Sequence, residues 1–229
     1  MLSITEENYL KAIFTLSYPK FSGYSSEIST SDIAKHLGIN SASVSDMLKK
    51  LHQKQLIDYV KYQGVKLTDE GRKIATDIVR KHRIWETFLV DKLNFTWDEV
   101  HEIAEQLEHI HSPLLIERLH QYLGSPDFDP HGEPIPDKRG LFPEDKMKNW
   151  ICLNSCNRQQ ILEVKCVKDD SSNLLHFLDK KQIRIGSKIK CVDTNNYDDS
   201  MEVEIDFKNI VVSLSREVSN KIYGVIINE

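Results

Sequence analysis

The segment VHEIAEQLEHIH, residues 100–111, carries histidines and glutamates whose spacing suits metal binding. At about 100° per residue, an α-helix places His101, Glu105, Glu108 and His109 within an arc of about 100°. Glu105, Glu108 and His109 follow the i, i+3, i+4 spacing, so their side chains converge one turn apart. Two carboxylates in this arrangement repel each other, and a divalent cation between them removes the repulsion. We therefore expect a metal site on this helix.

A second pair of donors precedes this helix in the segment KHRIWE, where His82 and Glu86 stand at i, i+4. Carboxylate oxygens and imidazole without a thiolate suit Mn²⁺ or Fe²⁺ better than a closed tetrahedral zinc site. The alternative is a solvated helix face that binds nothing. The matching offsets on two helices favour the metal site.

The N-terminal segment has the pattern of a DNA-binding head. Apolar residues at helical spacing between residues 9 and 16 predict a first helix. Two short helices follow, the first capped by Thr30 or Ser31 and ended by Gly38, the second beginning at Asn40 or Ser41. Two such helices joined by a glycine turn describe a helix-turn-helix.

Two short strands are then predicted on either side of Tyr62-Gln63-Gly64, and Thr68 is the expected N-cap of another helix. Helix-turn-helix, hairpin and helix together define a winged helix. We assign residues 1–72 to a winged helix-turn-helix DNA-binding domain.

Three further segments follow the head. Residues 73–140 read as an all-α dimerisation and metal-binding domain, which includes a helix running from Thr96 to Ile110. Residues 141–153 are assigned to the linker, and residues 125–146, which overlap with it, are rich in proline and glycine. Residues 154–229 contain short β-branched runs separated by polar turns, the pattern of a small β-barrel. The expected fold is therefore multi-domain.

Composition narrows the class of protein. The chain has 229 residues and a net charge of −5, yet residues 40–66 hold five lysines and two aspartates, a basic patch within an acidic chain. No apolar run reaches the roughly 20 residues that cross a bilayer, and no secretory signal is apparent, so we expect a cytoplasmic protein with no membrane partner. The four cysteines match no zinc pattern and are expected to be reduced.

The second helix of a helix-turn-helix enters the major groove by its N-terminal residues. Short polar side chains there can bond phosphates or base edges, and an alanine can contact a thymine methyl. The expected reading residues are Asn40, Ser41, Ala42, Ser43, Ser45 and Asp46. The expected phosphate-contacting and wing residues are Lys49, Lys50, Lys61, Tyr62 and Lys66. Lys54 is expected to be a solvated surface charge.

Several segments in order resemble the DtxR/MntR family of iron- and manganese-dependent repressors. They are TEENYLKAIFTL, the winged helix ending in YQGVKLTDEG, KHRIWE, VHEIAEQLEHI and GEPIP, between residue 5 and about residue 140. The segment IRIGSK resembles part of that family's SH3-like, FeoA-type C-terminal domain. The ordered set is specific, although no single motif is.

The resemblance implies roles for particular positions. Glu105, Glu108 and His109 match the principal metal ligands, and His82, Glu86 and His101 match the ancillary site. Iron-type members have cysteine where this chain has Glu105, so the resemblance favours Mn²⁺ over Fe²⁺.

The ligand expected from the first helix departs from the family pattern, and further oxygen donors can be named. Asn8 stands where manganese-type members have aspartate, so it offers a carbonyl oxygen without charge, and Glu6 or Glu7 could replace it. Asp129 is another possible oxygen donor. Asp170 falls near a position from which the SH3-like domain of long members supplies a ligand.

The sequence thus predicts a homodimeric, Mn²⁺-activated repressor that binds a palindromic double-stranded DNA operator and controls metal homeostasis. An Fe²⁺-responsive repressor is the nearest alternative. A winged-helix regulator that senses an organic ligand or thiol oxidation is the rival from another class. A metal hydrolase is disfavoured, because the chain has no HExxH pair.

Overall fold

The computed structural model describes residues 2–17, 28–60, 64–168, 171–208 and 210–227. The chain divides into two compact units. Residues 1–82, 105–116 and 136–142 form the first, and residues 83–104, 117–135 and 143–229 form the second.

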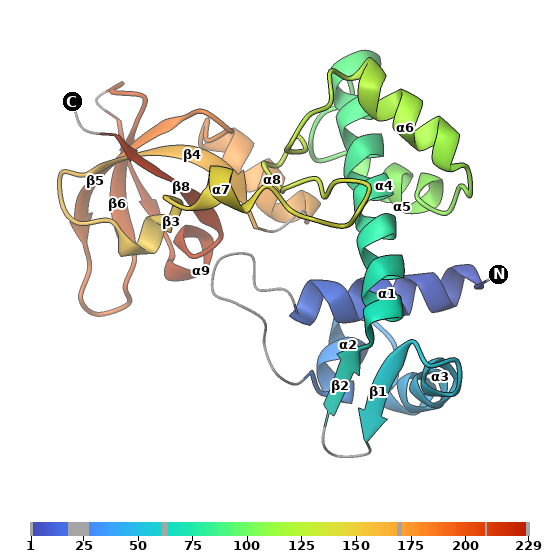
Figure 1. The fold of residues 1–229 in the computed structure, drawn as a ribbon. Coiled ribbons are helices and arrows are strands. Elements are labelled where there is room, and N and C mark those ends of the chain that lie inside the picture. Colours follow the sequence, from blue (N-terminus) through green and yellow to red (C-terminus); the bar gives the residue numbers. More distant parts are fainter. Residues whose placement is uncertain (1, 18–27, 61–63, 169–170, 209, 228–229) are drawn as a thin grey trace. The chain divides into compact units, whose positions relative to one another are not determined.

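The first unit contains the predicted winged helix (Figure 1). Its elements are α1 (Ile4–Ser17), α2 (Thr30–Leu37), α3 (Ser41–Gln53), β1 (Ile57–Val60), β2 (Gly64–Leu67) and the start of α4 (Asp69–Leu93). The strands pair antiparallel, from Ile57 opposite Leu67 to Val60 opposite Gly64. The turn of the hairpin, with Lys61 and Tyr62, lies outside the described residues.

Caps set the bounds of the two helices of the helix-turn-helix. The N-cap of α2 is Ser29, one residue before the predicted Thr30, because Ser29 and Asp32 exchange hydrogen bonds in a capping box. Gly38 ends α2 in the left-handed region at φ 66°. Asn40 caps α3 as predicted, since its side chain accepts a hydrogen bond from the Ser43 amide.

The core of the head explains why α1 is held firmly. Leu10 and Ile13 of α1 are fully buried, together with Ile33 of α2 and Leu48 and Leu51 of α3. Burial of such side chains contributes about 1.5–3 kcal/mol each. The helix that begins the chain is therefore a fixed part of the DNA-binding head.

Gly71 lets α4 approach the chain that leads into β1. A Cβ atom at this position would lie 1.9 Å from the carbonyl oxygen of Leu56, and that oxygen also accepts from the Thr68 amide. We predict that Gly71→Ala destabilises the head by about 3 kcal/mol, because backbone must move to relieve the overlap. Urea unfolding followed by circular dichroism tests this prediction. The exposed neighbour substitution Glu70→Ala should leave the midpoint unchanged, and an equally small effect of Gly71→Ala would contradict the packing argument.

The predicted helix from Thr96 to Ile110 is shorter in the structure. α5 covers Val100–Leu107 and α6 covers Pro113–Tyr122. The predicted start at Thr96 is wrong, because the Thr96 amide donates to the Glu99 carboxylate in a turn that precedes α5. The predicted end at Ile110 is also wrong, because the Ile110 amide bonds the Leu107 carbonyl in a tight turn. Glu108 and His109 therefore lie in the turn after the helix.

The second unit contains the predicted β domain. Its elements are α7 (Glu144–Met147), β3 (Ile151–Cys152), the 3₁₀ turn η1 (Leu153–Ser155), β4 (Ile161–Val167), α8 (Ser172–Lys180), β5 (Lys188–Thr194), β6 (Met201–Ile205), β7 (Val211–Leu214), α9 (Arg216–Ser219) and β8 (Ile222–Ile227). The strands form one antiparallel sheet in the order β3-β8-β4-β5-β6-β7. Among the described strands the sheet does not close into a full barrel, since β3 and β7 stay at its edges.

The four cysteines lie in this β domain, and none of the four forms a disulfide. Cys156, Cys166 and Cys191 are buried, and burial raises the pKa of Cys156 to about 12. A thiol that stays protonated is a poor nucleophile, so Cys156 is poorly suited to sense oxidation. No helix in the described part of the chain has the length and apolar character needed to cross a bilayer.

Candidate metal centre and DNA interface

Three of the predicted ligands converge inside the first unit. His82 comes from α4, Glu105 from the last turn of α5, and Glu108 from the turn that follows. One ligand atom from each of the three lies within 4.8 Å of the others. His82 Nδ1 lies 2.6 Å from Glu108 Oε2 and 4.0 Å from Glu105 Oε1. This arrangement can hold a cation between two carboxylates and an imidazole.

A cation from the chain itself lies at this point. Lys11 Nζ is 2.6 Å from Glu105 Oε1 and 2.6 Å from Glu108 Oε2. Burial alone would lower the pKa of Lys11, but the charges of Glu108 and Glu105 outweigh burial and raise it. Lys11 is therefore an ammonium ion, and it was not among the predicted site residues.

Glu108 is the most buried donor of the cluster, with a side chain 0% exposed. Burial raises its pKa, but the hydrogen bond from His82 and the charge of Lys11 outweigh it, so the pKa is below its ordinary value. Its Oε1 atom, like Oδ1 of Asn8, is buried without a hydrogen-bond partner among the described residues. Unsatisfied buried oxygens are costly, and a cation can supply the missing partner.

His109 takes a different place from the one predicted, because α5 ends before it. Its Nδ1 lies 2.6 Å from Oε2 of Glu7, and its Nε2 lies 3.9 Å from Oε1 of Glu108. The other oxygen of Glu7 lies 3.5 Å from Nε2 of His111. On α1 the charged oxygen facing the histidines thus comes from Glu7, one residue before Asn8.

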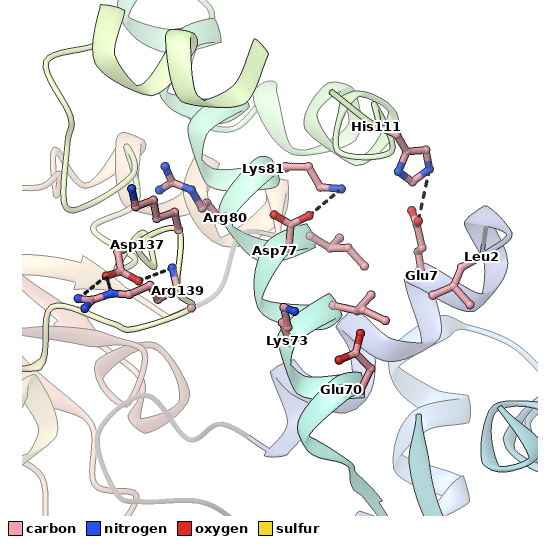
Figure 2. A pocket seen from close by; sticks show the side chains of 14 residues that line it. Leu2, Glu7, Glu70, Lys73, Asp77, Arg80, Lys81, His111, Asp137 and Arg139 are labelled. Atoms are coloured by element: carbon pink, nitrogen blue, oxygen red, sulfur yellow. Dashed lines mark hydrogen bonds and ion pairs between the residues drawn. The ribbon is translucent and has the colours of Figure 1, made fainter. Parts of the chain in front are cut away.

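A cavity of about 450 Å³ adjoins these groups in the first unit. Figure 2 shows Glu7 and His111 pointing toward each other on one side of it, and Asp77 paired with Lys81 on α4. Its lining mixes both signs of charge with Leu2 and apolar residues of α4. Glu7 and its partner His111 thus both line an opening of the surface.

A second group of donors lies in the other unit. Glu86 Oε1 is 3.7 Å from Nδ1 of His101, and Glu86 Oε2 is 3.7 Å from Nδ1 of His131. Glu86, Asp129 and His131 are all buried, and one ligand atom of each lies within 4.8 Å of the others. Arg83 adds a positive charge 3.6 Å from Asp129.

His131 already carries the positive charge of this second group. Burial lowers its pKa, but Glu86 and Asp129 more than compensate and raise the pKa to about 10. Nε2 donates to the carbonyl oxygen of Trp97 at 2.7 Å. An imidazolium and a guanidinium thus balance the carboxylates here, as the Lys11 ammonium does in the first group.

The predicted DNA-reading residues lie at the N-terminal end of α3. Ser41, Ala42, Ser43 and Asp46 are exposed, as are Asn40, Lys49, Lys50 and Lys66. Some of these polar side chains already bond within the helix. Asn40 caps it, Ser45 donates to the Ser41 carbonyl, and Asp46 pairs with Lys49 at 2.9 Å. The side chains of Ser41, Ala42 and Ser43 remain exposed to solvent, where DNA could contact them.

Glu6 joins α1 to the C-terminal end of α3. Its buried Oε1 lies 2.7 Å from Nζ of Lys54 and 3.2 Å from Nζ of Lys50, while Oε2 accepts from the Ser3 amide. Burial raises the pKa of Glu6, but these hydrogen bonds lower it to about 2. The expectation that Lys54 is only a solvated charge is therefore wrong.

Comparisons with known proteins place these features in a family. Residues 1–65 match the N-terminal DNA-binding domain of iron-dependent repressors, residues 68–137 match their metal-binding and dimerisation domain, and residues 151–225 match the FeoA domain. A solved structure titled as a manganese-dependent transcriptional repressor in complex with manganese is 32% identical, with a TM-score of 0.84. It covers 97% of this chain, and the match covers 100% of that structure. The chain belongs to the DtxR/MntR family of metal-dependent transcriptional repressors.

Two curated relatives add to the comparison. The iron-dependent repressor IdeR of Mycobacterium tuberculosis is 32% identical over 61% of this chain and 60% of its own length. A probable metal transport system membrane protein of Chlamydia trachomatis is 46% identical over 31% of this chain and 16% of its own length. The chain therefore spans less than two thirds of these curated relatives. The DtxR/MntR family consists of repressors, not enzymes, and its members bind DNA and dimerise.

The structure shows two residues near the proposed ligands that sequence reasoning missed. Lys11 and His111 were not singled out, and Glu7 was named only as a substitute for Asn8. Lys11 stands four residues after Glu7 and three after Asn8, on the same face of α1, but this spacing alone does not distinguish it from a solvated lysine. The predicted ligand Asp170 lies outside the described residues.

Proposed function

We propose that this chain is a homodimeric, Mn²⁺-activated repressor that binds a palindromic DNA operator in the cytoplasm and controls metal homeostasis. The observation that carries the proposal is the gathering of His82, Glu105 and Glu108 around one cation position. An Fe²⁺-responsive repressor is the alternative within the same family.

The donor set supports Mn²⁺ or Fe²⁺. His82, Glu105 and Glu108 would hold the ion, with His109 and a donor from Glu7 or Asn8 completing the set. Hard oxygens and imidazole, with no thiolate among them, suit these two ions. The ion would supply a divalent charge that holds the carboxylates of α5 and its following turn together with α1 and α4. Glu86 and His101 remain the proposed ancillary donors.

The first helix, α1, connects the proposed metal donors to the recognition helix α3. α1 carries Glu7 and Asn8 toward the metal donors and Glu6 toward the base of α3, so an ion that fixes α1 also biases the recognition helix. Because binding free energies are linked, DNA must raise metal affinity by the same factor as metal raises DNA affinity.

Dimerisation follows from the helical segment. Leu114 and Leu115 at the start of α6 are exposed, Leu114 by 63%. Such apolar side chains fit an isologous interface between two copies. A symmetric pair of recognition helices roughly 34 Å apart would read two half-sites, which is why we expect a palindromic operator.

The choice of metal can be measured directly. The protein competes anaerobically with a chelating dye, once for Mn²⁺ and once for Fe²⁺. After correction for the dye's own affinity for each ion, the protein should bind Mn²⁺ more tightly than Fe²⁺. A protein that binds Fe²⁺ tightly and ignores Mn²⁺ would establish the alternative. Binding of neither ion would reject the metal-activated proposal as a whole.

Lys66 on β2 gives a separate prediction for the DNA interface. Lys66→Ala should weaken binding to operator and to unrelated DNA by similar factors, because a phosphate contact carries no base information. The slope of log affinity against log salt should fall by about one. Gel shifts across a salt series measure this. The exposed lysine Lys148, placed in the other unit, serves as the control, and an unchanged slope for Lys66→Ala would remove Lys66 from the interface.

A further inference from the structure

The amine of Lys11 lies where three of the proposed ligands converge. Nζ is 2.6 Å from one oxygen of Glu105, 2.6 Å from one oxygen of Glu108, and 3.0 Å from Nδ1 of His82. Hydrogen bonds between an ammonium and carboxylates are short and strong. Lys11 therefore bonds the two carboxylate oxygens that the metal would use.

Lys11 is held in this position by its surroundings. Its side chain is only 15% exposed, and its neighbours on α1, Leu10 and Ile13, are fully buried in the core of the head. A lysine in this setting does not pair by chance with mobile surface carboxylates, because both its stem and Glu108 are enclosed.

A divalent ion and this ammonium cannot share the two carboxylates. A metal ion binds carboxylate oxygens at about 2–2.5 Å, and the same oxygens lie 2.6 Å from Nζ. The two cations would then be in contact, and two like charges at such a distance repel strongly. Either the lysine or the metal holds Glu105 and Glu108, but not both.

We propose that Lys11 is a tethered competitor for the metal. Its ammonium holds Glu105 and Glu108 together until a divalent cation displaces it, so that position 11 sets the metal concentration at which the protein switches. This inference rests on the proposed function, because the contested carboxylates are the proposed ligands.

Exchange of the Lys11 ammonium for a metal ion would act on α1, the helix that also contacts α3. Lys11 stands on α1 one turn after Glu7 and Asn8, and the same helix reaches the base of α3 through Glu6. When the ammonium leaves, the contact that fixes α1 to Glu105 and Glu108 is replaced by the bonds of the ion. The tethered competitor therefore occupies the helix that links metal to DNA.

Substitution of Lys11 tests the proposal through metal affinity. Competition of the full chain with a chelating dye gives the Mn²⁺ affinity of the wild type, Lys11→Met and Lys11→Arg. Lys11→Met should bind Mn²⁺ about tenfold more tightly or better, because a positive charge has been removed from the site. Lys11→Arg keeps the charge and should stay within about threefold of the wild type. Lys35→Met, an exposed lysine of α2, is the matched control and should not change the affinity.

The outcomes separate the two proposals. Equal or weaker Mn²⁺ binding by Lys11→Met, beside a wild type that binds Mn²⁺, overturns the competitor while leaving the proposed function in place. A wild type that does not bind Mn²⁺ or Fe²⁺ at all overturns both.

A measurement on the wild type avoids any dependence on the folding of a variant. The rate at which an amine-reactive reagent labels Lys11 is followed by peptide mass spectrometry with chelator and with saturating Mn²⁺. Displacement predicts faster labelling of Lys11 with Mn²⁺ and no change at the exposed Lys148. An unchanged rate at Lys11 under saturating metal contradicts the proposal.

Discussion

Replacing Glu105 and Glu108 together by glutamine should abolish metal-dependent DNA binding. The two carboxylates supply the negative charge of the proposed site, and glutamine keeps their volume while removing that charge. The operator affinity at saturating Mn²⁺ should fall by about 100-fold, to the level of the wild type with chelator. Gel shifts with labelled operator, with and without Mn²⁺, measure both values.

Glutamine is the better choice than alanine because of Lys11. A double alanine variant would leave a buried ammonium without its two partners, and an unpaired buried charge is strongly destabilising. Glutamine side chains can still accept a hydrogen bond from Lys11 Nζ. Glu102→Gln, at an exposed position of the same helix, is the control. Undiminished, metal-responsive binding by the double variant would refute the ligand assignment.

Glu6→Gln should separate metal binding from DNA binding. Glu6 is the buried contact between α1 and the recognition helix, through Lys54 and Lys50. Without its charge, the factor by which Mn²⁺ raises operator affinity should fall about tenfold, while Mn²⁺ affinity measured without DNA should stay nearly constant. The head should also lose about 1–3 kcal/mol of stability, because hydrogen bonds to a charged group are lost.

The two affinities of Glu6→Gln are measured on the same preparation, by chelator competition and by gel shift. Glu70→Gln, an exposed change on α4, is the matched control. If Glu6→Gln retained the full effect of Mn²⁺ on operator affinity, α1 would not transmit through this contact. If it lost Mn²⁺ affinity as well, Glu6 would act on the metal site itself.

The DNA-binding head could be predicted from sequence because its signals are local. Helical periodicity, the N-cap of Asn40 and the left-handed turn at Gly38 each act within a few residues. Even the error at α2 was small, since Ser29 competes with Thr30 and Ser31 as a cap, and the reciprocal bond with Asp32 decides the choice.

The metal centre was predicted in part, and the errors have a common cause. The i, i+3, i+4 argument for Glu105, Glu108 and His109 assumed a helix through residue 110. α5 ends at Leu107, so His109 turns toward Glu7. The end of a helix depends on the turn that follows and on its partners, which periodicity alone does not reveal.

Lys11 and His131 could not be identified from spacing because their partners are distant in sequence. Lys11 meets Glu105 and Glu108 across more than 90 positions, and His131 meets Glu86 across more than 40. A lone lysine on an amphipathic helix usually remains solvated. Only the hydrogen bonds of Lys11 to Glu105 and Glu108 in the structure show that this lysine faces two carboxylates.

The most direct test of the account is the operator affinity of the wild-type dimer before and after removal of metal. Thorough chelation should lower the affinity by about 100-fold, and addition of one to two equivalents of Mn²⁺ per chain should restore it. A protein that binds its operator equally tightly after complete chelation, with metal content confirmed as absent by elemental analysis, would contradict the claim that cation capture controls DNA binding.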